Sequence, residues 1–303
     1  MNDGTVHMSV EEAIEAIQIY KKESGKTQAV IAKELDVSSG LLSSFLAGTY
    51  KTPHTLVPKV EQLLNIAEQK EIAPVEPDFV PTTVSDMVIN AISYCHIQGK
   101  IAVIYGDAGV GKTMAINEYC KKNPLAIKIT VAPSYSSMSG VNELLAEKLG
   151  VRERVSRKIY AEIIAKLKGS GRVIVIDEAQ HLTVRTLNHI RCLADESAIG
   201  IALIGNDEVY TKMKGSGRAD FAQLFSRIGM RKQVLTSTNS KTDIKNVFSN
   251  VFDDDAIELL YRISRTAYGL RGAVNVYINT AAVFGNIDAS KIARMTKEMN
   301  IGG

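Results

Sequence analysis

The sequence has few cysteines and no long apolar run, and each shortage excludes a class of protein. Its three cysteines, Cys95, Cys120 and Cys192, lie far apart in apolar surroundings. They lack the spacing of metal ligands, so we interpret them as buried free thiols. Residues 1–4 are polar, and no apolar run approaches the roughly 18 residues of a membrane-spanning helix. We therefore expect neither a secretory nor a transmembrane segment, and a cytoplasmic location.

A strong overall charge is also missing, because the formal net charge is only +3 at pH 7. The charges are nevertheless unevenly distributed along the chain. Residues 1–65 hold 6 Lys and Arg against 8 Asp and Glu, residues 66–83 hold 1 against 4, and residues 84–303 hold 29 against 21. The last segment thus has an excess of basic residues, which suggests a polyanionic partner such as nucleic acid.

The most specific motif follows an apolar, β-prone run at residues 101–105 and precedes a helix-forming segment. It consists of Gly106, Asp107, Ala108, Gly109, Val110, Gly111, Lys112 and Thr113. The glycines allow a tight loop whose N–H groups face a polyphosphate together with the positive end of the next helix. Lys112 is expected to reach the β- and γ-phosphates and Thr113 to bind Mg²⁺. The alternative, a glycine-rich turn that happens to carry a lysine, leaves the preceding strand and following helix unexplained.

Beyond this loop, strands and helices alternate. Strands are predicted at 126–131 and 173–176, and helices at 141–149 and 159–167, which favours a parallel, doubly wound α/β sheet. The apolar strand at 173–176 delivers Asp177 to its carboxyl end, where it would hold the magnesium shell while Glu178 polarises the attacking water. A helix cap is the alternative for this pair of acids.

The N-terminal segment is helical in pattern. Residues 10–22 form an amphipathic helix, with Ser9 as its N-cap and Glu12 closing a capping box. Helices at 27–35 and 38–47 meet at a tight turn and resemble a repressor-type helix-turn-helix. The second of them has no Arg or Lys, so contact with DNA and docking to protein both stay open. Lys51, just beyond it, is the candidate phosphate contact.

A proline-rich segment follows. Residues 68–83 contain three prolines, at 74, 77 and 81, which predicts a semi-extended linker. The predicted organisation is a helix-turn-helix domain at 1–67, this linker at 68–83, an α/β core at 84–253 and a helical lid at 254–303.

Several further residues complete a resemblance to the AAA+ ATPases. Asn206 follows the apolar run at 199–204. The run at 221–228, which contains Ser226 and Arg227, ends a predicted helix, and Gly269-Leu270-Arg271-Gly272 starts another. The resemblance implies that Asn206 orients water beside the γ-phosphate. It also implies that Arg227 enters the site of a neighbouring subunit and that Arg271 reaches the phosphates. Surface arginines are the alternative for both.

The helix-turn-helix, the linker and the run of residues 176–182 narrow the resemblance to the transposition target-selection ATPases. This resemblance implies an ATP- and Mg²⁺-dependent protein, in a bacterial host cell, that forms helical filaments on duplex DNA without sequence preference. It implies delivery of target DNA to a transposase, stimulation of strand transfer, target immunity, and disassembly by ATP hydrolysis to ADP and phosphate. The alternatives are a replication-initiator or helicase-loading ATPase and a nucleotide-switched transcriptional regulator.

The best candidate DNA contact in the ATPase part is a basic segment that contains Arg152, Arg154, Arg157 and Lys158. Residues 152–172 hold 7 Lys and Arg against 2 Asp and Glu. Such a cluster can track phosphates with a steep salt dependence and little sequence preference. The alternative is a solvated basic helix face. A weaker stripe consists of Lys291, Arg294 and Lys297.

Overall fold

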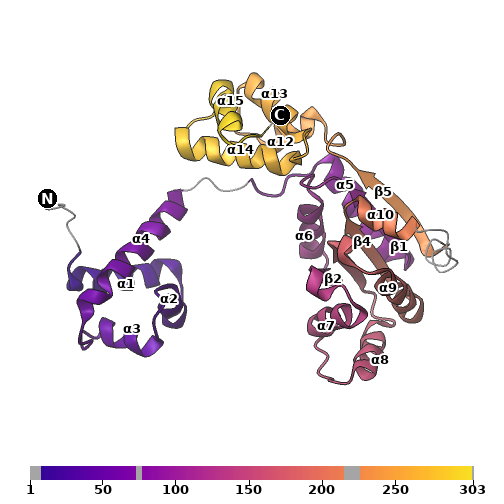
Figure 1. The fold of residues 1–303 in the computed structure, drawn as a ribbon, viewed down its shortest axis with the longest axis horizontal. Coiled ribbons are helices and arrows are strands. Elements are labelled where there is room, and N and C mark those ends of the chain that lie inside the picture. The colour runs from indigo at the N-terminus through magenta and orange to yellow at the C-terminus, as the bar shows by residue number, and fades with distance from the viewer. Residues whose placement is uncertain (1–7, 73–76, 215–225, 302–303) are drawn as a thin grey trace. The chain divides into compact units, whose positions relative to one another are not determined.

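The computed structural model describes residues 8–72, 77–214 and 226–301. It divides into two compact units, Met1–Pro74 and Val75–Gly303. Figure 1 shows the elements of both units. Of the helices that these ranges contain, none has the length and apolarity to cross a bilayer.

The first unit is built of helices. They are α1 (Val10–Ser24), α2 (Gln28–Glu34), α3 (Ser39–Leu46) and α4 (Val57–Ile72), with a 3₁₀ turn, η1 (Pro53–Thr55), before α4. The predicted capping box is confirmed, because the Ser9 side chain accepts from the N–H of Glu12 and the Glu12 carboxylate accepts from the N–H of Ser9. Ile17, Leu42 and Phe45 are completely buried in the core of this unit.

The turn between α2 and α3 is held from both sides. Val37 donates its N–H to the carbonyl of Ala32 at 2.9 Å, and Lys59 on α4 donates to the carbonyls of Leu35 and Asp36, both at 3.3 Å. Helix α4 continues to Ile72, so residues 68–72 are helical and the predicted linker at 68–83 begins too early.

The second unit contains one five-stranded sheet. Its strands are β1 (Ile101–Gly106), β2 (Ala126–Thr130), β3 (Val173–Asp177), β4 (Gly200–Gly205) and β5 (Ile228–Val234), in the order β2-β3-β4-β1-β5. Every pairing in it is parallel, which confirms the predicted doubly wound sheet. Because parallel strands end at one edge, the residues after β1, β3 and β4 come together there.

Helices cover both faces of this sheet. On one face lie α5 (Thr83–Gln98) and α6 (Lys112–Lys122), which pack against Ala102 and Ile104 of β1. On the other lie α7 (Met138–Leu149), α8 (Ser156–Leu167), α9 (Val184–Ser197) and α10 (Asp207–Lys214), with Val103 of β1 in their core. Alternate residues of one strand thus serve two separate cores.

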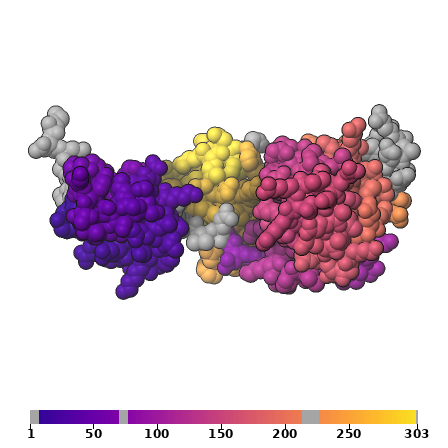
Figure 2. Space-filling view, turned by 90° about the horizontal axis from the view of Figure 1, so that it is seen from below, coloured from indigo at the N-terminus to yellow at the C-terminus, as the bar shows by residue number. Residues whose placement is uncertain are grey.

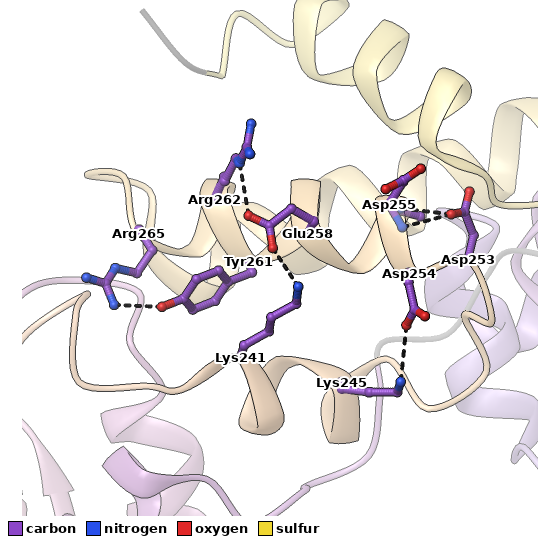
Figure 3. Close-up of polar contacts among 10 residues, drawn as sticks. Lys241, Lys245, Asp253, Asp254, Asp255, Glu258, Tyr261, Arg262 and Arg265 are labelled. Carbon is purple, nitrogen blue, oxygen red and sulfur yellow. Dashed lines mark hydrogen bonds and ion pairs between the residues drawn. The ribbon is translucent and has the colours of Figure 1, made fainter.

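The C-terminal helices form a third core. They are α12 (Lys241–Val247), α13 (Asp254–Ser264), α14 (Gly269–Phe284) and α15 (Ala289–Glu298). Ile244 and Phe248, which precede the predicted lid boundary at 254, are fully buried in the same cluster as Leu260 of α13. The helical cluster, called the lid below, therefore begins at α12. Ion pairs also join α12 to α13 on the surface, Lys241 to Glu258 at 2.7 Å and Lys245 to Asp254 at 3.1 Å (Figure 3).

Asp243 ties the lid to the core. It closes a capping box with Ser240 at the start of α12, and it accepts from the N–H and the hydroxyl of Thr83 on α5, at 3.1 and 2.8 Å. Burial by itself raises the pKa of Asp243, but the hydrogen bonds from Ser240 and Thr83 outweigh it and leave the pKa below its ordinary value. The ionised form therefore stabilises the fold.

We predict that Asp243→Asn lowers the free energy of unfolding by about 2 kcal/mol at pH 7, since an N-cap and a buried acceptor are weakened together. Because the native pKa is depressed, the charge stabilises the fold above the unfolded pKa of about 3.9, and this advantage disappears as the pH falls through the native pKa. Denaturant unfolding between pH 7 and pH 3 measures the difference. Asp254→Asn is the control, because the Asp254 side chain is 84% exposed. A wild-type advantage that stays constant with pH would contradict the assignment.

Candidate active site

A cavity of about 410 Å³ opens at the carboxyl edge of the sheet. Its walls come from the loop after β1, the ends of β3 and β4, the lid, and the segment before α5. The residues that line it include Pro77, Asp78, Phe79, Val80, Ala108, Gly109, Val110, Gly111, Lys112, Thr113, Asp177, Glu178, Gln180, Gly205, Asn206, Val247, Leu270, Arg271 and Val274. Most of the residues predicted from the sequence thus share one cavity.

The loop after β1 is anchored to the end of β5. Gly106 has φ 137°, and a Cβ there would lie 1.9 Å from the carbonyl oxygen of Val234, so only glycine fits. Asp107 donates its N–H to the same carbonyl at 3.0 Å, and its Oδ2 accepts from the N–H of Thr236 at 2.7 Å. Gly106 and Asp107, predicted as ligand contacts, are absent from the cavity wall and instead hold the loop in place.

The remainder of the loop has the features of an anion cradle. Gly109 and Gly111 have φ of 70° and 107°, and α6 starts at Lys112 without a side-chain cap. Its first N–H groups are therefore available to an anion. The Lys112 ammonium donates to the carbonyls of Gly106 and Asp107, at 3.0 and 2.5 Å. Burial lowers the pKa of Lys112, although nearby Glu178 and Asp177 oppose the shift. A polyphosphate would supply the anionic partner that favours its charged form.

Two oxygen donors stand beside this cradle. The hydroxyl of Thr113 donates to Oδ2 of Asp177 at 3.1 Å, and Asp177 is buried at the end of β3. Within the described ranges, no three His, Cys, Asp or Glu side chains converge as a metal site. A hydroxyl and one carboxylate nevertheless suit Mg²⁺, which usually takes its other ligands from phosphates and water.

Glu178 follows directly and has a strained backbone. Its φ is 57°, in the left-handed region that non-glycine residues rarely adopt. Its N–H donates to Oδ1 of Asp177 at 3.0 Å, and its carboxylate accepts from the side-chain amide of Gln180. Asn206, after β4, donates its N–H to Oε1 of Gln180 at 3.3 Å, and its own Oδ1 accepts from the N–H of Glu208 at 2.9 Å.

The lid contacts the cradle through α14. Arg271 lines the cavity, and its N–H donates to the carbonyl of Gly109 at 2.9 Å. Gly269 has φ 61°, and a Cβ on it would lie 2.8 Å from the carbonyl oxygen of Ala108. The glycine therefore permits the close approach of α14 to the loop.

Buried Asn239, between β5 and α12, adds a second link. Its Oδ1 accepts from the N–H of Val84 on α5 at 3.2 Å, and its amide donates to the carbonyl of Val110 at 3.4 Å. This one side chain thus connects the base of the lid, the core and the cradle.

Arg227 does not line this cavity. Its Nε lies 3.1 Å from Oδ1 of Asp195 on α9, and its side chain is 56% exposed. Residues 221–225 of the helix predicted before it lie outside the described residues. The role of Arg227 toward another subunit therefore stays a prediction.

The candidate DNA contacts are also remote from the cavity. Arg152, Arg154, Arg157 and Lys158 lie in the loop between α7 and α8 and at the start of α8, and all four are exposed. The chain around residue 150 forms part of the face in Figure 2. Among the described residues none of the four makes an ion pair, in contrast to Lys241 and Lys245 on the lid. Lys51 belongs to the first unit, where it is also exposed.

Several residues in or beside the cavity were not predicted from the sequence. Residues 77–80 were assigned to a spacer, but they belong to the second unit and line the cavity. Lys128 on β2 lies 3.6 Å from Oδ2 of Asp177, and its place follows from the pairing of β2 with β3. Gln180 was visible in the Asp-Glu-Ala-Gln run, but no local rule assigned it a partner.

Comparison with known proteins identifies the family. A profile of the AAA domain matches residues 96–213. The chain is 31% identical over 273 residues to the Mu-like prophage FluMu DNA transposition protein B of Haemophilus influenzae, which spans 87% of this chain and 94% of that protein. It is 32% identical over 250 residues to the ATP-dependent target DNA activator B of Escherichia phage Mu, covering 80% of this chain and 78% of that protein. The chain belongs to the phage Mu transposition protein B family.

Solved structures support the same fold. The crystal structure of Cdc6p from Pyrobaculum aerophilum is similar with a TM-score of 0.53 and 15% identity, over 75% of this chain and 70% of that one. A chain of Drosophila ORC bound to DNA is similar with a TM-score of 0.52 and 14% identity, over 77% and 65%. At such identities the likeness concerns the fold alone. With the family match, it confirms the predicted AAA+ fold class.

We predict that Gly269→Ala weakens binding of a fluorescent ATP analogue by about tenfold or more, because a methyl group would push α14 away from the cradle and misplace Arg271. Gly285→Ala is the matched control, since Gly285 has φ 72° but no atom within 4 Å of a Cβ. Both variants place a methyl group on a backbone with positive φ, and only Gly269→Ala has the steric clash. Equal affinities in the two variants would show that the contact does not support the site.

Proposed function

We propose that this protein is an ATP-dependent target DNA activator. In this proposal it binds duplex DNA largely without sequence preference, assembles on it as a helical filament, delivers it to a transposase and stimulates strand transfer. ATP hydrolysis to ADP and phosphate then disassembles the filament. The observation that carries the proposal is a phosphate cradle with an adjacent acid pair, in a chain that aligns with 94% of a transposition protein B.

The cavity residues divide the work of nucleotide binding. The N–H groups of residues 108–113 and the Lys112 ammonium would hold the phosphates, and Thr113 and Asp177 would hold Mg²⁺, which would neutralise charge on the phosphates. Phe79, Val80, Val247, Leu270 and Val274 line the same cavity and offer an apolar surface to the base. Arg271 would bring the lid's positive charge to the phosphates.

Hydrolysis requires that the attacking water lose a proton. The Glu178 carboxylate, which lines the cavity, would accept it, and Asn206 in the same cavity would orient the water. Arg227 would complete the site of a neighbouring copy, where its charge would stabilise the transition state. Its exposure supports this role, because an exposed ion pair such as the one with Asp195 is worth little and breaks readily. A homo-oligomer would then be required for full activity.

The basic segment is proposed as the main DNA contact. Four exposed cations without acidic partners among the described residues suit a polyanion, and their long side chains suit phosphate contacts of low sequence preference. A role for the first unit in DNA binding, through Lys51 and α3, remains a second proposal. In α3, Ser39–Leu46, there is no basic residue to support it.

We predict opposite filament phenotypes for two changes in the cavity. Lys112→Ala should weaken ATP binding by about a hundredfold, since charge-assisted hydrogen bonds to phosphate are lost, and should abolish filaments.

Glu178→Gln should bind ATP normally but turn it over about 10²- to 10⁴-fold more slowly, because the proton acceptor is lost, and should leave long-lived filaments. Electron microscopy on random-sequence duplex DNA with ATP or ADP, together with phosphate release, measures both.

The control for Lys112→Ala is Lys121→Ala, an exposed change at the other end of the same helix. Unchanged ATP affinity in Lys112→Ala, or rapid turnover in Glu178→Gln, would contradict the assigned roles. Discrete rings that depend on a helicase partner would favour the replication-initiator alternative.

We also predict that replacing Arg152, Arg154 and Arg157 together by Ala lowers DNA affinity. The slope of log affinity against log salt should fall by up to about three units, because each phosphate contact contributes about 0.9. The matched control replaces Lys241, Lys245 and Arg262, three lid cations that already pair with Glu258 or Asp254. An equal change of slope in both triple variants would mean that only net charge matters.

A further inference from the structure

Gln180 connects two residues of the proposed catalytic site. It lies in η3 (Ala179–His181), two residues after Glu178. Its side-chain NH₂ donates to Oε2 of Glu178, and its Oε1 accepts from the N–H of Asn206 at 3.3 Å. Its backbone carbonyl accepts from the ammonium of Lys212 on α10. One side chain thereby bridges the ends of β3 and β4.

The orientation of this amide is fixed by its partners. A carboxylate accepts only and a backbone N–H donates only, so the NH₂ must face Glu178 and the oxygen must face Asn206. A flipped amide would place its oxygen against the carboxylate and its NH₂ against an N–H. Both hydrogen bonds therefore specify a single arrangement.

The neighbouring backbone makes room for the amide. Gly205 is fully buried at the end of β4, and a Cβ there would lie 2.4 Å from Oε1 of Gln180 and 2.6 Å from Cγ2 of Val209. Any larger residue at 205 would displace the Gln180 side chain. The glycine and the glutamine thus fit together as a pair.

Glu178 depends on this contact for its orientation. Its backbone is fixed in the left-handed region, but its carboxylate still has three side-chain torsions. Among the described residues, the hydrogen bond to that carboxylate comes from Gln180. Gln180 engages one lone pair of Oε2, so the carboxylate keeps lone pairs that can accept a proton from water.

We propose that Gln180 is a positioning residue that holds the Glu178 carboxylate in a fixed relation to Asn206. Through Gln180, a ligand that binds in the cavity beside Asn206 changes the orientation of the Glu178 carboxylate, the proton acceptor. A ligand that displaces Asn206 moves its N–H, the Gln180 amide follows, and the carboxylate moves with it. This inference rests on the proposed ATP hydrolysis and adds to it a residue that acts through the Glu178 carboxylate.

The test compares the wild-type chain of 303 residues with Gln180→Met, which keeps the side-chain length and removes both hydrogen bonds. Phosphate release gives kcat and KM, and a fluorescent ATP analogue gives affinity. We expect Gln180→Met to lower kcat by about tenfold to a hundredfold, as misplacement of a catalytic group does, while ATP affinity changes by less than about twofold. Gln98→Met, an exposed change at the end of α5, is the matched control and should behave like the wild type.

A double variant separates positioning from general damage. Since Gln180 acts through the Glu178 carboxylate, adding Gln180→Met to Glu178→Gln should reduce kcat no further. Additive losses of kcat in the double variant would overturn the proposal. A loss of ATP affinity that parallels the loss of kcat in Gln180→Met would also overturn it. So would a rise of kcat in Gln180→Met, because Gln180 would then inhibit hydrolysis. If Lys112→Ala abolishes turnover but Gln180→Met turns over ATP like the wild type, this inference alone would be overturned. A wild type without turnover would overturn the proposed hydrolysis as well.

Discussion

The close approach of three backbones around residues 106–111 is the constraint on which the rest of this structure depends. β5 approaches from one side and leaves no space for a Cβ at Gly106, and α14 approaches from the other and leaves none at Gly269. A loop between two such neighbours has little freedom before any ligand arrives. Its N–H groups are therefore preorganised, and binding does not have to supply the entropy of ordering them.

The charges at the carboxyl edge follow from the same arrangement. Parallel strands bring Asp177 and Glu178 close to Lys112 at the start of the neighbouring helix. Burial lowers the pKa of Lys112, and these two carboxylates favour its charged form. Lys128 adds a second cation beside Asp177. The site thus combines partly buried carboxylates and ammonium groups of opposite charge, which a polyphosphate and a divalent cation are suited to join.

The parts that sequence predicted well are those set by local chemistry. The glycine-lysine loop, the buried strand before Asp177 and the capping box of Ser9 each have a signal within a few residues. Residues 77–80 carry no such signal, because a proline-rich segment is typical of a linker and only the folded structure shows that it lines the cavity.

The start of the lid was also not predicted. Helix α12 has only seven residues, so its apolar pattern is too short to identify it, and the burial of Phe248 depends on helices far along the chain. Gln180 was similar, since its partner Asn206 is adjacent in space only because β3 pairs with β4.

The buried amide of Asn239 has a mechanical meaning. It lies in the connection through which the lid leaves the sheet, and it holds Val110 of the cradle and the first turn of α5 at the same time. A lid that turned on this connection would stretch both hydrogen bonds in a place where water cannot replace them. The lid is therefore joined to the phosphate loop through Asn239 as well as through α14, and a displacement of the lid would strain both connections.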